Sequence, residues 1–141
     1  MSQISNQPLP ATTQPKWLTI TGWGITVLVV LGLFVSAGFK LSVPLKLGDY
    51  QKMEEEFNKG GFSAKAMEII GIVEIACALI YLFPRTAVLG AALLNGYLGG
   101  AICAHVVQKQ PIWAPLIFGV VMWLGIYLRE PRLRAIMPWR T

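Results

Sequence analysis

The sequence predicts an all-α fold: an integral membrane four-helix bundle, with a short amphipathic helix in the connector between spans one and two. Only 13% of the 141 residues are charged and 55% are apolar, whereas about 25% of the residues of a typical soluble domain carry a charge. The apolar residues gather in four stretches that contain almost no charge, and each stretch has about the 17–25 residues that a transmembrane helix needs. This composition excludes a disordered chain, a nucleic-acid-binding domain and a large soluble enzyme.

Helix is the secondary structure that suits these stretches. Lipid offers no hydrogen bonds to the backbone, so a span must be a helix or part of a closed barrel. Barrel strands alternate apolar and polar residues, and residues 27–31, Val-Leu-Val-Val-Leu, do not. Residues 1–15 are polar, contain three prolines and are expected to form a flexible tail. Residues 16–141 are expected to form a single four-span membrane domain, with spans at about 17–39, 66–83, 86–107 and 111–128.

The first stretch admits a second interpretation, a cleaved signal peptide, because Val35-Ser36-Ala37 fits a small-residue cleavage pattern. Its apolar run of about 20 residues exceeds the usual 7–15 residues of such a peptide. The segment before it is long and carries a single basic residue, Lys16. We therefore favour a span that is retained.

The connections between the later spans are short. Pro84-Arg85 separates spans two and three, and residues 108–111 separate spans three and four, so these spans are expected to be antiparallel neighbours. The connector between spans one and two is longer, with Asp49 as a possible N-cap and Gly60-Gly61 as a stop. Apolar residues recur in it at helical spacing, namely Leu47, Tyr50, Met53 and Phe57. This helix would lie on the membrane surface or fold over the mouth of the bundle, unless the segment is an ordinary solvated connector.

The basic residues favour one orientation. An even number of spans places both termini on one side, and each side carries six Lys or Arg residues. On the side of the termini, Arg85 and the arginine cluster that begins at Arg129 lie closest to the span ends. Basic residues beside span ends favour the cytoplasmic side, so we expect both termini there. The net charge of +5 is then explained by topology, and no nucleic-acid partner is expected.

Polar residues inside the spans are expected to form two groups. Glu74 lies nine residues before the end of its span, so the helix rise places it about 13 Å from the turn. Asn95 in the next span lies at the same depth and Tyr97 about 3 Å further, so these three side chains are expected to meet near the middle of the membrane. A second group is expected at the outer mouth of the bundle, formed by Lys40, Glu68 and His105.

Glu74 is the strongest candidate for a functional residue. A charged side chain at the bilayer centre costs about 2.5–3.5 kcal/mol on insertion scales, and such residues usually face the bundle interior and serve a ligand, ion or proton path. The alternative is that an uncharged Glu74 hydrogen-bonds across helices and only fixes their packing. His105 is likewise either functional or a satisfied interfacial histidine, and Lys40 would otherwise extend to the headgroups.

The third span carries a face of small residues. Small residues at four-residue spacing let helices approach closely, and they are found here at Ala92, Gly96, Gly100 and Ala104, with Gly99 beside them. This face would serve either a contact inside the bundle or self-association of the chain.

Several segments of the sequence resemble the DoxX-like family. They are residues 70–75 (IGIVEI), 84–91 (PRTAVLGA), 96–101 (GYLGGA) continuing to His105, and 123–129 (WLGIYLR) followed by 132–134 (RLR). The segment Ser36-Ala37-Gly38-Phe39-Lys40 is similar to the small-residue-plus-lysine motif of the family. The resemblance covers about residues 17–140 and is most specific between Glu74 and His105.

The resemblance implies a multi-pass protein of the bacterial inner (cytoplasmic) membrane. The family is named after a subunit of a thiosulfate:quinone oxidoreductase, and other members are described as membrane components of oxidoreductase or redox-stress complexes. The main hypothesis is therefore a non-catalytic subunit or scaffold of a larger membrane complex, redox-linked or quinone-linked. Its partners would be the lipid bilayer and either other subunits or further copies of the chain.

The alternative hypothesis is a small proton-linked carrier, or a protein that binds a small molecule such as a quinone or a lipid, using Glu74 inside the bundle. We expect no catalytic residue, no metal site and no cofactor held by the chain alone. The sequence has no GxGxxG, no CxxC, no iron–sulfur spacing and no haem-type histidine pair.

Overall fold

The computed structural model describes residues 15–136, and within them it contains six α-helices and no strand, which confirms the all-α prediction. In chain order the helices are α1 (Lys16–Ser42), α2 (Tyr50–Lys59), α3 (Ala64–Leu82), α4 (Ala87–Val107), α5 (Trp113–Arg129) and α6 (Pro131–Ile136). Residues 1–14, nearly all of the expected tail, and residues 137–141 lie outside the described part.

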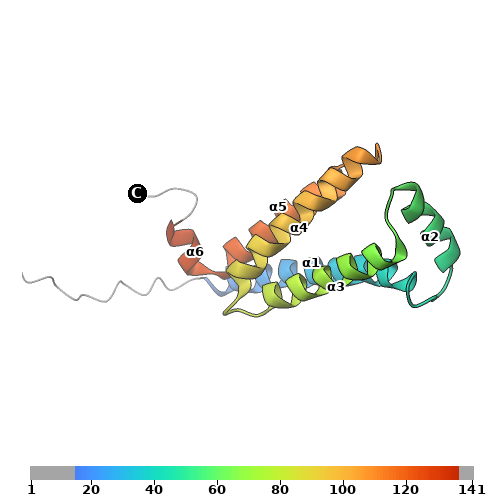
Figure 1. Cartoon of the computed structure of the whole chain (residues 1–141). Coiled ribbons are helices and arrows are strands. Elements are labelled where there is room, and N and C mark those ends of the chain that lie inside the picture. The colour runs from blue at the N-terminus through green and yellow to red at the C-terminus, as the bar shows by residue number, and fades with distance from the viewer. Residues whose placement is uncertain (1–14, 137–141) are drawn as a thin grey trace, which may run out of the picture.

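The four long helices form a ring in which α1 packs on α3 and α5, and α4 packs on the same two helices. Figure 1 shows two arms, α1 with α3 and α4 with α5, which converge beside α6 and diverge toward α2. We call the converging side the closed end and the other side the open end. The open end is where the short helix α2 lies, in contact with α3.

The helix ends follow from local signals in the sequence. The connector helix predicted between Asp49 and Gly60 is present, because these two residues flank α2. The second long helix begins at Ala64, two residues earlier than expected, since the Ser63 hydroxyl accepts a hydrogen bond of 3.2 Å from the Ala66 backbone N–H. The last short helix, α6, was not predicted.

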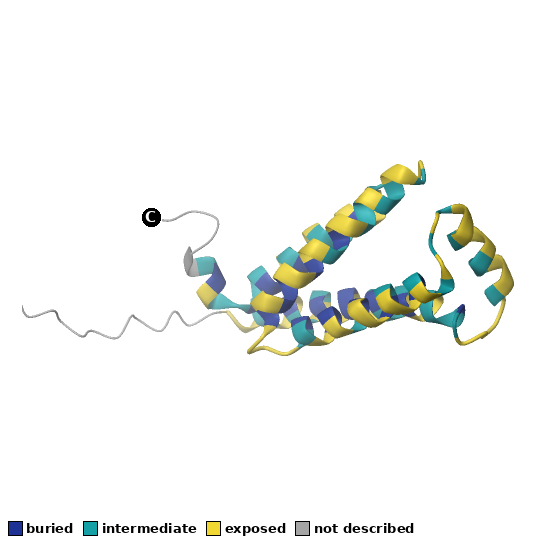
Figure 2. Ribbon diagram, viewed as in Figure 1, coloured by how far each residue is buried: buried dark blue, intermediate teal, exposed yellow. Residues whose placement is uncertain are grey.

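The closed end is held by a close approach of α3 and α4. A Cβ at Gly90 would overlap the backbone nitrogen and Cα of Tyr81, so only glycine allows this contact. The buried core lies around it and includes Leu33, Ala78, Leu94, Met122 and Ile126. Figure 2 shows the buried residues on the facing sides of the helices and an exposed outer surface.

The outer surface is rich in large apolar side chains. Two helices, α1 and α4, are long and apolar enough to cross a membrane, and α5 is a shorter apolar helix. Exposed side chains on these helices include Leu28 and Ile20, each 70% exposed, and Val107, 78% exposed. Large exposed apolar surfaces are typical of contact with a membrane or a partner.

Candidate functional site

A cavity of about 610 Å³ lies between the two arms. Lys40 and Glu74 line it from the first arm, and Tyr97 and His105 line it from α4. Residues of α2, including Phe57, complete its wall at the open end. Four of the six residues predicted for a polar or ligand site therefore face one cavity, although the sequence assigned them to two groups.

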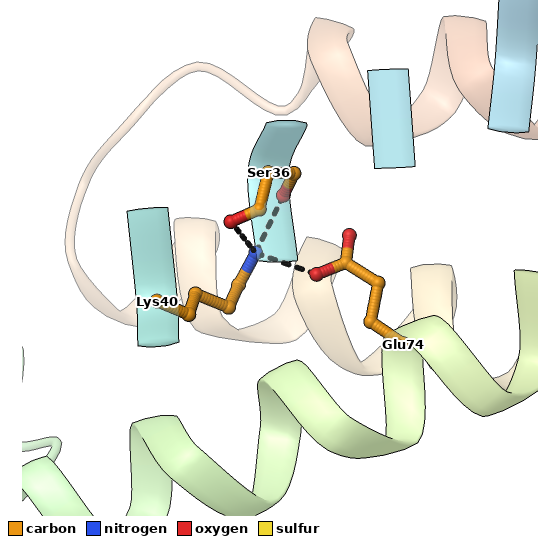
Figure 3. A network of polar contacts seen from close by, with 3 residues as sticks. All are labelled: Ser36, Lys40 and Glu74. Atoms are coloured by element: carbon orange, nitrogen blue, oxygen red, sulfur yellow. Dashed lines mark hydrogen bonds and ion pairs between the residues drawn. The ribbon is translucent and has the colours of Figure 1, made fainter. Parts of the chain in front are cut away.

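The centre of the cavity wall is an ion pair between Lys40 of α1 and Glu74 of α3. Lys40 Nζ lies 3.0 Å from Glu74 Oε2, and it also donates to Ser36 Oγ at 2.5 Å (Figure 3). The Glu74 side chain is 2% exposed and that of Lys40 is 20% exposed. Charges so deeply buried are found almost only as pairs, and Lys40 is the partner of Glu74 here.

Tyr97 and His105 add polar atoms to the opposite wall. The Tyr97 hydroxyl interacts with the Glu74 carboxylate across the gap between α4 and α3. His105 Nδ1 lies 2.7 Å from the backbone oxygen of Pro111, and since a carbonyl oxygen only accepts, Nδ1 carries the hydrogen. In a neutral imidazole the second ring nitrogen, Nε2, is then a hydrogen-bond acceptor.

Two predicted site residues are not brought to this cavity. Asn95 is exposed, and its Oδ1 accepts from Trp123 Nε1 at 3.4 Å on the outer side of α4 and α5. Asn95 and Tyr97 are two residues apart on a helix, so they point about 200° apart. Glu68 is exposed on α3. The expected groups were wrong in this respect, because depth along a span does not give the direction of a side chain.

The small-residue face of α4 does not serve as a contact inside the bundle. Within the described chain, nothing lies within 4 Å of a Cβ built at Gly96, Gly99 or Gly100. Gly96, Gly100 and Ala104 form a smooth wall of the cavity, while Ala92 and Gly99 are exposed. Close packing of α4 occurs instead at Gly90. Self-association through the exposed part of this face stays a prediction.

A second polar cluster, which the sequence did not reveal, lies at the closed end. Arg129 is 8% exposed, and its Nη2 donates to the Tyr81 backbone oxygen at 2.6 Å. Its guanidinium lies over the Trp23 ring, 4.6 Å from the centroid, and the Tyr81 hydroxyl donates to the Met122 backbone oxygen at 2.8 Å. The sequence placed Arg129 only in a basic cluster beside a span end, so its burial as a packing residue was not expected.

Ser36 is the site residue that could have been found from the sequence. It precedes Lys40 by four residues, and residues at this spacing lie on one face of a helix. Among the described residues, no group of three or more His, Cys, Asp or Glu side chains is arranged to hold a metal ion.

Comparison with known proteins gives one match. The sequence model of a family described as the DoxX-like family matches residues 24–125. Curated proteins and solved structures provide no match to the chain.

Proposed function

The chain belongs to the DoxX-like family, and on this premise we propose that it is a four-span protein of the bacterial cytoplasmic membrane that binds a small amphipathic molecule in the Lys40–Glu74 cavity. Both termini would lie in the cytoplasm. The chain would act without catalysis of its own, as a ligand-binding subunit of a larger membrane complex, and a quinone is one ligand of suitable size and polarity.

The proposed topology is supported by the helices. The long apolar helices α1 and α4 satisfy the length of a span, and α3 and α5 pack beside them in the same ring. Because Glu74 of α3 is buried and paired with Lys40 of α1, its charge does not have to face lipid. Arg85 and Arg129 lie at the closed end, which the positive-inside rule would place at the cytoplasmic surface.

The single observation that carries the binding proposal is that a buried ion pair lines a cavity. A buried pair often stabilises a protein no better than apolar residues of similar volume, so packing alone does not explain its presence. Ionisable residues inside membrane bundles usually serve a ligand or an ion. The cavity volume of about 610 Å³ lies within the ~300–1,000 Å³ of small-molecule sites, which combine apolar walls with a few polar groups.

The proposal is tested by asking what the protein retains on purification. The protein is extracted directly from membranes into nanodiscs, and bound small molecules are identified by mass spectrometry. Glu74→Gln should lower the amount of the retained molecule by at least about tenfold, the cost of one lost charge-assisted hydrogen bond. The matched control is Glu68→Gln, because Glu68 is an exposed acid on the same helix. Equal retention in both variants, or no retained molecule in the wild type, would overturn the proposal.

A second candidate is a scaffold role through self-association, favoured by the uncovered outer face of α4. Gly99 is exposed with space around it, and Cys103 follows four residues later and is also exposed. Two copies that pack through this face would bring their Cys103 side chains together, whereas Cys77 is buried. A short bismaleimide should then link two copies in membranes, and Cys103→Ser should abolish the product. A cross-linked dimer that persists in Cys103→Ser, or its absence in the wild type, would exclude this arrangement.

A further inference from the structure

Resting on the proposed function, we infer that the ligand is a lipid with an uncharged, hydrogen-bonding head and a long apolar chain. The head occupies the Lys40–Glu74 cavity. The apolar chain of the lipid occupies a separate groove beside α1 and α5, and this groove adjoins the cavity.

The groove is a second hollow of about 380 Å³. Its own walls are apolar and are formed by Gly32, Val35 and Phe39 of α1. Four further residues line both this groove and the larger cavity, namely Ser36, Lys40, Phe57 and Phe118. The two hollows therefore meet at the Lys40 side chain, and a molecule held there has an apolar path leading away from its polar end.

Gly32 lets the Phe118 ring lie directly against α1 in the wall of the groove. A Cβ at Gly32 would lie 2.7 Å from Phe118 Cζ, so any larger residue would push the Phe118 ring out of its position. From Gly32 to Lys40 the helix rise gives about 12 Å. A groove of this length accommodates an extended apolar chain. A ligand that consists of a head alone would gain little binding free energy from it.

The charges around the cavity favour an uncharged head. Both carboxylates that line it are already paired, Glu74 with Lys40 at 3.0 Å and Glu56 with Lys59 at 2.9 Å. A charged head would find no opposite charge left to neutralise it, and burial of an unpaired charge is costly. A head with a hydroxyl group needs only hydrogen bonds.

The polar atoms that remain suit such a head. All three N–H groups of the Lys40 ammonium are engaged, by Glu74 Oε2 at 3.0 Å, Ser36 Oγ at 2.5 Å and the Ser36 backbone oxygen at 3.4 Å. His105 supplies an acceptor at Nε2 when its ring is neutral. The Tyr97 hydroxyl donates its hydrogen toward the Glu74 carboxylate, so its oxygen is left as an acceptor. These three residues thus offer acceptors at Tyr97 and His105, which matches a head that donates from a hydroxyl group, such as an alcohol or a hydroquinone-type head.

The inference is tested with three probes added to the purified full-length protein in detergent, with binding measured by native mass spectrometry. The probes are 1-oleoylglycerol, 1-butyrylglycerol with the same head and a short chain, and oleate with the same chain and an anionic head. We expect 1-oleoylglycerol to bind at least about tenfold more tightly than either; against 1-butyrylglycerol this corresponds to about two buried methylene groups, and against oleate it reflects the cost of burying an unpaired charge. Equal binding of 1-butyrylglycerol would overturn the chain assignment, and tighter binding of oleate would overturn the uncharged head.

Two substitutions in α1 test where the apolar chain of the lipid binds. Gly32→Leu should weaken 1-oleoylglycerol by at least about tenfold and leave 1-butyrylglycerol unchanged. The matched control is Gly24→Leu, because Gly24 is exposed, has nothing within 4 Å in the described chain and lines neither hollow. If Gly32→Leu folds poorly, Val35→Trp fills the same groove from a position that is 59% exposed. Unchanged binding in the folded variant would overturn the groove assignment.

The two proposals fail in different ways. If the wild-type protein retains a small molecule whose release depends on Glu74 but shows no preference for a long chain, the proposed function stands and this inference is overturned. If nothing is retained and no probe binds, both are overturned.

Discussion

Replacement of Lys40 by methionine should destabilise the protein strongly. Methionine keeps most of the apolar stem of Lys40 and removes its charge, so the Glu74 carboxylate, whose side chain is 2% exposed, would be left without a cation. Breaking a buried ion pair in this way costs about 3–5 kcal/mol. Because the Lys40 side chain is still 20% exposed, we expect the lower end of this range. A cost of about 3 kcal/mol corresponds to about a hundredfold change in the unfolding equilibrium.

Removal of both charges should cost much less than removal of one. In the double variant Lys40→Met with Glu74→Leu, no unpaired charge remains, and apolar replacement of a buried pair is often neutral or stabilising. We expect the double variant to lie within about 1 kcal/mol of the wild type. The coupling between the two sites would then be about 2 kcal/mol or more, which is typical of residues in direct contact.

The free energies are measured by titrating dodecyl maltoside micelles with sodium dodecyl sulfate and following helix content by circular dichroism. Lys65→Met is the control, since Lys65 is an exposed lysine on α3 and should change the free energy of unfolding by less than about 0.5 kcal/mol. A similarly small effect of Lys40→Met, or a coupling below about 0.5 kcal/mol, would refute the reasoning that this pair is buried and mutually dependent.

Three further results are expected. Gly90→Ala should lower the free energy of unfolding by about 3 kcal/mol because its Cβ would overlap the α3 backbone, whereas Gly99→Ala should be neutral or up to about 1 kcal/mol stabilising; similar values for the two would contradict the close approach. Arg129→Lys should cost about 1–3 kcal/mol in the same titration, since lysine cannot reproduce the planar contacts of the guanidinium, and a neutral effect would show that these contacts do not stabilise the fold. A hydrogen bond from Lys59 to Glu56, and after it the charge of Glu56, raise the pKa of Lys59. The pair therefore stabilises α2 below the ordinary lysine pKa, and this contribution is lost as the pH rises through the raised pKa. Glu56→Gln should return the pKa of Lys59 toward its ordinary value in an NMR titration, and an unchanged pKa would exclude the pair.

The helices were predictable because their signals are local. Long charge-free runs predicted α1 and α4, and the pair Asp49 and Gly60 predicted the limits of α2. The helix rise alone correctly placed Glu74 and Tyr97 at a similar depth on neighbouring helices.

The partners of individual side chains could not be predicted in the same way. Lys40 was expected near the surface, yet its long side chain reaches Glu74, and this depends on how far α1 and α3 are rotated about their axes. The glycines of α4 carry a small-residue pattern that fits close packing, but Gly96 and Gly100 line the cavity between the arms. Such outcomes depend on the angle between helices, which no single span specifies.

The tight contact at Gly90 holds α3 and α4 together at the closed end, so a change in the angle between the arms would displace their far ends most. The arms are fixed near one another at the closed end, while α4 extends 21 residues, or about 31 Å, toward the open end. From Gly90 to Val107 the helix rises about 26 Å, so a change of about 5° in the angle between the arms would move the far end of α4 by about 2 Å. At that end Gln108 touches Gly60 beside α2, since its Cδ lies 2.7 Å from a Cβ built there. A displacement of this size would separate the two residues, so the angle between the arms would set how wide the cavity opens at this end.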